Sequence, residues 1–558
     1  MPYPTLAPSD TWFTQGGTTV KRASITEIEI KNSYAPVGTP TASWDASAAK
    51  DGSIMAYVEG TKLTIAGNGS GMVYANPDSS WVFSDHNKAD YFNNVTNIKG
   101  AELLNTSKAT TFERLFESCE KLASVNVSNW DTGCVTNMFT TFSKCYALKN
   151  LDVSNWETGN VKTMRSTFQV CLALESLELS KWDVHNVETF QGMFMSSSGA
   201  MNLTTIGDTT NWNTGACTTM QTMFQNCASL KKLYVSNWDV SNVISMKNMF
   251  YECTSLEELD VSNWDVSKVT TFSGMFRGVY IKELDVSNWS TPSATDMSAM
   301  FYMCNNIKIP LDVSNWDVSN VTTFDHMTAH SGIVLNGVEN WRTPSAVNMN
   351  AMFHCIGNTV IDVSNLDTSN VQFFCQMFEN SGKLTHIIGL ENFDTSNGIG
   401  FDGMFERCVS LKELNLSSFD TRKAKDGVTC STNGSKTATL NGMFYDTPSL
   451  EKITLGPNFS PNGDGTTTNT SNHAILPTTN DGYWYDINEN AYEPSAVFNL
   501  THRTYYASKD AMQEDADRFV LVKNGSLMRT AEAIRSKSGK TSGITPSEFA
   551  EILASQAP

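Results

Sequence analysis

The chain has 558 residues, of which 40% are hydrophobic and 10% aromatic, so it can bury a large core and does not have the composition of a disordered protein. Its 39 basic and 58 acidic side chains give a net charge of −19 at pH 7, which opposes binding to nucleic-acid phosphates and to anionic lipid. No stretch is apolar over the length needed to span a bilayer, so we expect no nucleic-acid partner and no membrane insertion.

The first part of the chain, residues 1–100, is predicted to be a β-rich N-terminal capping module. Residues 24–30 alternate in part between polar and apolar side chains, and residues 53–58 and 62–66 flank Glu59-Gly60 as a hairpin. Such a module can cover the open edge of a repeat that follows it. No basic region followed by an apolar one opens the segment, so no secretion signal is visible.

From residue 101 to 457 one pattern recurs about a dozen times with a period of about 26 residues, and its cleanest copy runs from Leu256 to Phe276. Each copy has an anchor, usually the aromatic residue after Ser-Asn, and a landmark Phe lies twelve residues after nearly every anchor. Thr328 takes the landmark position after Trp316, and the last copy has a long insertion between Phe419 and Phe444. The anchors are Leu104, Trp130, Trp156, Trp182, Trp212, Trp238, Trp264, Trp289, Trp316, Trp341, Leu366, Phe393 and Phe419.

The first half of a repeat has the pattern of a strand. Leu256, Leu259 and Val261 alternate with Asp260 and Ser262, so the apolar side chains share one face and the polar ones share the other. The anchor Trp follows and is expected to lie in the core.

The second half of a repeat predicts a short helix, because Phe272, Met275 and Phe276 recur at i, i+3 and i+4. Each unit is therefore predicted as strand, turn, short helix and return loop. One unit is too small to fold by itself, so we expect the units of residues 101–457 to stack into one leucine-rich-repeat-like solenoid.

The pattern Leu-x-x-Leu-Asp-Val-Ser-Asn-Trp-Asp, together with Met-Phe-x-x-Cys-x-Ser-Leu, resembles the BspA-type leucine-rich-repeat surface proteins of bacteria. The resemblance covers roughly residues 100–457 and implies a role in adhesion at a cell surface. In ordinary leucine-rich repeats the Asn follows the last apolar strand residue by three, whereas Asn263 follows Val261 by two, so the turn geometry is expected to differ.

The cysteines predict a row of buried thiols, because seven of the twelve lie three residues after the landmark position and none forms a zinc signature. These seven are Cys119, Cys145, Cys171, Cys227, Cys253, Cys304 and Cys408. Among the histidines only His326 and His330 share a helical spacing, and a surface pair is the simpler interpretation. We find no catalytic motif, so the sequence predicts no catalytic residue, no metal site, no cofactor and no enzymatic activity.

The C-terminal part is predicted to hold a small aromatic-rich β module, residues 458–518, and a helical hairpin, residues 519–558. Thr545-Pro-Ser-Glu548 has the form of a capping box that opens the second helix. The segment resembles the short helical tail of phage and prophage tail-associated proteins. The resemblance implies that residues 526–558 mediate homo-oligomerisation or assembly into a tail.

The outward strand position between the two apolar residues is mostly acidic, and stacked strands would turn it into a polar stripe. Its members are Asp152, Glu178, Tyr234, Asp260, Asp285, Asp312 and Asp362. The stripe is either a solvated face or a recognition surface for a cell-surface protein or glycan.

Three functions remain open from the sequence. The first is a noncatalytic host-recognition protein of a phage or prophage tail, located in the virion. The second is a BspA-like adhesin on the bacterial cell surface. The third is a glycan-active enzyme whose catalytic site lies in a terminal module.

Overall fold

A computed structural model describes residues 4–8, 12, 13, 20–69, 72–85, 90–425, 428, 429, 437, 438, 440–464, 474–495, 497 and 503–512. The chain divides into two compact units, Met1–Asn358 and Thr359–Pro558, and each is described by itself. One continuous repeat body over residues 101–457 therefore stays a prediction, as does the helical hairpin of residues 519–558, which lies outside the described residues.

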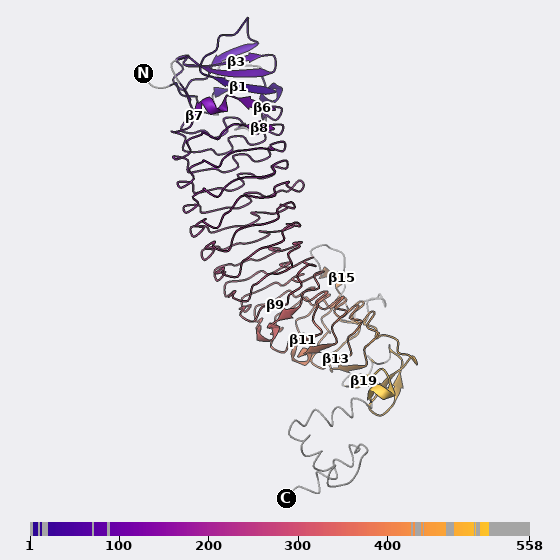
Figure 1. Ribbon diagram of the computed structural model, residues 1–558. Helices are drawn as coiled ribbons and strands as arrows, with labels where there is room; N and C mark the ends of the chain where they lie inside the picture. Colours follow the sequence, from indigo (N-terminus) through magenta and orange to yellow (C-terminus); the bar gives the residue numbers. More distant parts are fainter. Residues whose placement is uncertain are drawn as a thin grey trace. The chain divides into compact units, whose positions relative to one another are not determined.

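The first unit begins with a mixed six-stranded sheet of order β2-β3-β4-β1-β6-β8 (Figure 1). The strands are β1 (Glu27–Lys31), β2 (Ala42–Asp45), β3 (Ile54–Glu59), β4 (Lys62–Gly67), β6 (Asn97–Lys99) and β8 (Ser124–Val125). The predicted hairpin is confirmed, because β3 and β4 pair antiparallel around Gly60, which has a φ of 63°. β1 pairs in parallel with β4 and β6, and β6 pairs in parallel with β8, so this sheet leads directly into the strands of the repeats.

Three smaller elements accompany the N-terminal sheet. The 3-10 helix η1 (Arg22–Ser24) precedes β1, and β5 (Val73–Tyr74) pairs in parallel with β7 (Leu104–Asn105).

Each following repeat of the first unit forms one coil, and neighbouring coils are joined at two columns of parallel backbone pairs (Figure 1). The first column lies at the predicted strand. Between some coils it consists of a single backbone bridge, such as that of Lys232 with Glu258. Between others it is a two-residue strand pair, such as β9 (Leu311–Asp312) with β10 (Leu335–Asn336). The second column follows the Trp turn and is unbroken over eleven residues. They are Asp78, Thr111, Asn137, Thr163, Thr189, Thr219, Ser245, Thr271, Asp296, Thr323 and Asn348.

The predicted short helix of each repeat is wrong, because this segment forms successive turns. Alternate backbone N–H groups donate to the next coil instead of to their own turn, and the pairs in one repeat are Met246 to Thr271, Asn248 to Ser273 and Phe250 to Met275. The intervening residues donate three positions back, as Met249 does to Met246 at 3.1 Å.

Left-handed backbone is the physical reason that no helix forms here. In most repeats the residues two before and two after the landmark position have positive φ, for example Asn248 at 53° and Glu252 at 56°. A right-handed helix of L residues cannot include such residues. The sequence did indicate this conformation, because glycine, which tolerates positive φ, recurs two residues before the landmark position. These glycines are Gly192, Gly274, Gly403 and Gly442.

The core of the first unit contains two stacks of aromatic rings. The landmark rings from Phe116 to Phe301 stack with centroids 5.2–5.9 Å apart and planes within 12° of parallel. The anchor rings are buried beside them, with Trp130 and Trp156 stacked at 6.3 Å and 4°. The predicted burial of the tryptophans is confirmed.

The anchor tryptophans also make a hydrogen bond that the sequence did not reveal. Each indole Nε1–H donates to a backbone carbonyl of the preceding coil at 3.0–3.3 Å, as Trp264 does to Val235. The tryptophans making this bond are Trp130, Trp156, Trp182, Trp212, Trp238, Trp264, Trp289, Trp316 and Trp341. The ring therefore fills the core and gives a second donor to a carbonyl that already accepts a backbone N–H, as the Val235 carbonyl does from Trp238 at 3.0 Å.

Three repeats replace the Ser-Asn turn by a 3-10 helix that follows a left-handed glycine. These helices are η2 (Ala101–Leu103), η3 (Val338–Asn340) and η4 (Leu390–Asn392). A Cβ at Gly337 would lie 2.5 Å from the Cα of Ser314 in the preceding coil. Only glycine permits so close an approach between the two backbones.

The second unit contains further repeats and, among its described residues, a mixed five-stranded sheet. β11 (Val360–Asp362) pairs in parallel with β12 (His386–Ile388), and β13 (Glu413–Leu416) pairs in parallel with β16 (Lys452–Leu455). β16 is followed across the sheet by the antiparallel strands β19 (Thr504–Tyr506), β17 (Trp484–Asp486) and β18 (Ala491–Tyr492). The insertion before Phe444 contains the antiparallel pair β14 (Val428–Thr429) and β15 (Thr437–Ala438).

Candidate functional site

The predicted stripe residues of the first unit lie on the outward face of the strand column. Asp152, Asp260, Asp285 and Asp312 are exposed, and Tyr234 keeps 38% of its surface accessible. Alternate residues along each strand are buried, as the strand pattern predicted. The sixth predicted site residue, Asp362, is half-buried and belongs to the second unit.

The aspartates of this outward face hold the turn that follows each strand. Oδ1 of Asp260 accepts hydrogen bonds from the backbone N–H of Ser262 at 3.1 Å and from its hydroxyl at 2.7 Å. The same pair of bonds recurs from Ser154 to Asp152, from Ser287 to Asp285 and from Ser314 to Asp312. A ligand would therefore meet chiefly the second carboxylate oxygen, Oδ2, of each aspartate.

These hydrogen bonds favour the ionised form of two of the aspartates. The Ser154 hydroxyl and N–H lower the pKa of Asp152, and those of Ser314 lower the pKa of Asp312. Both carboxylates are therefore ionised at neutral pH.

The outward face is less uniformly acidic than the sequence indicated, because cations cross it between neighbouring coils. Lys232 Nζ lies 2.9 Å from Glu258 and 5.2 Å from the ring centre of Tyr234. Lys149 Nζ lies 3.0 Å from Glu175 in the same way. Asp260, Asp285 and Asp312 follow one another in three successive repeats, and none of the ion pairs between described residues includes them.

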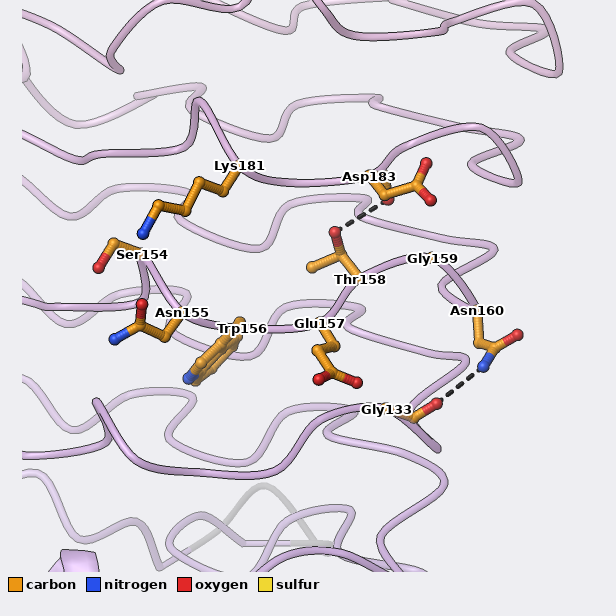
Figure 2. A pocket seen from close by; sticks show the side chains of 10 residues that line it. All are labelled: Gly133, Ser154, Asn155, Trp156, Glu157, Thr158, Gly159, Asn160, Lys181 and Asp183. Carbon is orange, nitrogen blue, oxygen red and sulfur yellow. Dashed lines mark hydrogen bonds between the residues drawn. The ribbon is translucent and has the colours of Figure 1, made fainter.

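A shallow polar hollow of about 460 Å³ lies beside the Trp156 turn of the first unit (Figure 2). The Thr158 hydroxyl donates a hydrogen bond to the Asp183 backbone carbonyl at 2.9 Å, and this bond joins two neighbouring coils that line the hollow. The Trp156 ring is only 2% exposed, so it offers no platform for stacking a sugar. The lining residues are Gly133, Ser154, Asn155, Trp156, Glu157, Thr158, Gly159, Asn160, Lys181 and Asp183.

A second hollow, of about 480 Å³, lies on the outward strand face of the second unit and was missed by sequence reasoning. Its wall carries two exposed apolar side chains, Val360 at 44% and Ile388 at 49%, beside the polar side chains of His386, Glu413 and Lys452. The sequence contained a sign of this hollow: Val360 and Ile388 are apolar residues at outward strand positions, where most other repeats have polar or acidic residues. This hollow joins apolar and charged groups as many recognition surfaces do.

The seven cysteines of the repeat series are buried, as predicted, and each thiol lies against a backbone carbonyl of the preceding coil at 2.9–3.3 Å. Burial raises the pKa of Cys171 and of Cys304 to about 12, so these thiols stay protonated and unreactive at neutral pH. Cys375, which is not one of these seven, is disulfide-bonded. Cys375 directly follows Phe374 and does not lie three residues after a landmark position. The argument for a buried row of free thiols therefore does not cover it.

The described part of the C-terminal module has one strongly held carboxylate. Asp486 is 1% exposed, lies 2.9 Å from Arg503, and accepts hydrogen bonds from Asn490 and from the Tyr492 hydroxyl. Burial raises the pKa of Asp486, but these hydrogen bonds outweigh it and leave the pKa below its ordinary value. An ionised and fully bonded carboxylate suits a structural role better than that of a catalytic acid.

Two histidines and one cysteine meet at the end of the first unit, where the sequence predicted no metal site. His330, His354 and Cys355 each place one ligand atom within 4.8 Å of the other two. His326, the predicted partner of His330, instead directs Nδ1 to the Asp325 carboxylate at 3.0 Å. Partial desolvation of the imidazole and the neighbouring His326 lower the pKa of His330, although the residue as a whole is exposed.

The architecture and the polar outward face define a protein of stacked leucine-rich-type repeats. Family comparison agrees: the model described as "Mycoplasma protein of unknown function, DUF285" matches residues 86–206, 195–311, 280–358, 306–388 and 355–454, and the chain belongs to this family. The match supports the predicted resemblance to BspA-like repeat proteins.

Comparison with other proteins adds little detail. No curated protein matches the chain. One similar solved structure is a leucine-rich repeat protein from Eubacterium ventriosum, with 12% identity and a TM-score of 0.26, covering 78% of this chain and 100% of that one. No helix among the described residues is both long and apolar enough to cross a membrane.

Proposed function

We propose that this protein is a noncatalytic binding protein that recognises a cell-surface protein or glycan through the outward face of its strand column. The observation that carries the proposal is the row of Asp260, Asp285 and Asp312, exposed in three successive repeats and fixed in orientation by their serines. Repeated, rigidly held polar groups suit an extended ligand that meets several coils at once.

Membership in a BspA-like repeat family supports a surface role. The net charge of −19 favours a ligand that carries positive charge or offers many hydroxyl groups. Assembly through residues 526–558, and with it the phage-tail role, rests on residues outside those that the structure describes.

The test removes the negative charge of these three aspartates and preserves the turns that their side chains stabilise. Asn in place of Asp retains an Oδ1 that accepts the serine hydrogen bonds, so the triple variant Asp260→Asn, Asp285→Asn, Asp312→Asn should fold like the natural chain. We expect it to attach to target cells at least about tenfold more weakly, because several charged contacts to one ligand are lost together. Attachment is measured by binding of the labelled protein to whole cells.

The chain offers a matched control one turn away. Asp239, Asp265 and Asp317 are exposed, and each accepts the backbone N–H of a serine two residues later at 3.0 Å, but they follow the Trp and lie off the strand face. Converting these three to Asn should leave attachment unchanged. Equal attachment by the two triple variants would reject the strand face as the binding surface.

A further inference from the structure

His330, His354 and Cys355 are brought together by the repeat itself. His330 and Cys355 occupy the same left-handed position of two consecutive coils, with φ of 57° and 58°. His354 precedes Cys355 in the chain, so both residues of the second coil face the one histidine of the first. The convergence therefore depends on the stacking of coils and is invisible as a local sequence motif.

The three side chains already lie close to one another. The rings of His330 and His354 are 4.4 Å apart at 66°, and the ligand atoms of all three residues lie within 4.8 Å. His354 is buried, Cys355 is half-buried and His330 is exposed, so one edge of the cluster opens to solvent. The His330 backbone N–H donates to Nδ1 of His354 at 3.3 Å, and Gly332 N–H donates to the Cys355 carbonyl at 3.0 Å, which fixes both coils.

Two imidazoles and one thiol form a ligand set for a particular class of ion. Nitrogen and thiolate sulfur favour zinc and similar divalent transition metals over calcium or magnesium, which require oxygen ligands. Zinc lies about 2.0–2.1 Å from nitrogen and about 2.3 Å from sulfur, so ligand atoms of a tetrahedral site are separated by roughly 3.3–3.8 Å. The ligand atoms of the present cluster lie within 4.8 Å of one another, so metal binding requires them to approach by up to about 1.5 Å.

We propose that His330, His354 and Cys355 bind one divalent transition-metal ion of the zinc class, with the fourth coordination position open to solvent on the His330 side. A neutral imidazole has a single lone pair, so the metal would replace the long hydrogen bond that His354 accepts. Because the ligands come from two coils, the bound ion would also fasten the end of the first unit against unfolding.

Cobalt(II) provides the probe, because a thiolate ligand gives it a charge-transfer absorption that nitrogen ligands do not. The full chain, produced without a histidine tag, reduced and freed of metal, is titrated with Co²⁺ and then with Zn²⁺. We expect one equivalent of Co²⁺ to bind with thiolate charge transfer, Zn²⁺ to displace it, and Zn²⁺ to raise the thermal midpoint. Cys355→Ser should abolish the charge-transfer band, and His330→Gln should weaken binding at least tenfold.

The chain supplies controls of the same residue types. Cys134 and His185 are exposed residues of the first unit away from the cluster, so Cys134→Ser and His185→Gln should bind Co²⁺ like the natural chain. His330 is exposed, so its replacement tests the site without disturbing the core. The proposal is overturned if no stoichiometric binding occurs, if Cys355→Ser keeps the charge-transfer band, or if the control variants lose as much affinity as the cluster variants.

Discussion

At the scale of single residues, the side chains that recur most strictly have two roles at once. The anchor Trp264 packs in the core and donates to the Val235 carbonyl at 3.0 Å, and Asp260 faces solvent while it holds the Ser262 turn. The sequence showed the first role of each residue through hydrophobic periodicity. It could not show the second, because the hydrogen-bond partner of Trp264 lies one repeat away and depends on how the coils stack.

The indole hydrogen bond can be separated from the packing of its ring. Trp264→Ala should lower the free energy of unfolding by about 3–5 kcal/mol, because it removes a large buried ring. Trp264→Phe keeps most of the ring and removes the indole donor, while the Val235 carbonyl still accepts the backbone N–H of Trp238, so this change should cost about 0.5–1.5 kcal/mol. Chemical denaturation measures both changes.

Asp265→Asn is the control for these variants, since its Oδ1 can still accept the Ser267 N–H, and it should stay within about 0.5 kcal/mol of the natural chain. If the Phe variant is as stable as this control, the indole hydrogen bond contributes nothing to folding.

At the scale of the structural element, the strand face was predictable and the turn segment was not. Alternation along Leu259, Asp260 and Val261 predicts one buried and one exposed face, and the structure has both. The spacing of Phe272, Met275 and Phe276 is the same in a helix and in a chain of turns that buries every third or fourth residue. The glycines before Met-Phe were the distinguishing feature, because a helix interior disfavours glycine and a left-handed turn favours it.

A reciprocal pair of substitutions tests the turn segment. Gly274 and Ala299 occupy the same left-handed position of adjacent repeats, with φ of 62° and 52°. Gly274→Ala should destabilise the protein by about 1 kcal/mol, because a Cβ there is strained and would overlap Asn248 Oδ1. Ala299→Gly relieves the same strain and should stabilise by about 0.5–1 kcal/mol after the larger entropy of the unfolded glycine is subtracted.

Thermal and chemical unfolding of the two variants give the signs directly. If this segment were a helix, Gly274→Ala would stabilise the protein and Ala299→Gly would destabilise it, because alanine is favoured over glycine in a helix.

At the scale of the whole molecule, each coil bonds to its neighbours through equivalent residues, and stability is therefore built from similar increments. The repeat length and register were predictable because they recur many times in the sequence. The His330, His354 and Cys355 cluster and the hollow beside Val360 and Ile388 were not, because each depends on departures from the repeat in neighbouring coils.

Deleting one whole repeat should preserve the fold. Removal of residues 239–264 joins Trp238 to Asp265, so the sequence around the junction still reads Ser-Asn-Trp-Asp and the second column still pairs Thr219 with its next equivalent, Thr271. We expect cooperative unfolding with a free energy lowered only by one coil and its interface. Removal of residues 239–251, about half a coil, should abolish cooperative unfolding, because every later residue is then placed against the wrong partner. Similar melting of both deletions would show that register is unimportant.

The unbroken column from Asp78 to Asn348 also has a consequence for heredity. Near-identical coding units recombine unequally, and such exchange adds or removes whole units in frame. In this architecture each remaining backbone group meets an equivalent partner in the new neighbouring coil. Variants with more or fewer coils can therefore arise in one step and still fold. A lineage can thus change the number of coils without altering the chemistry of any single coil.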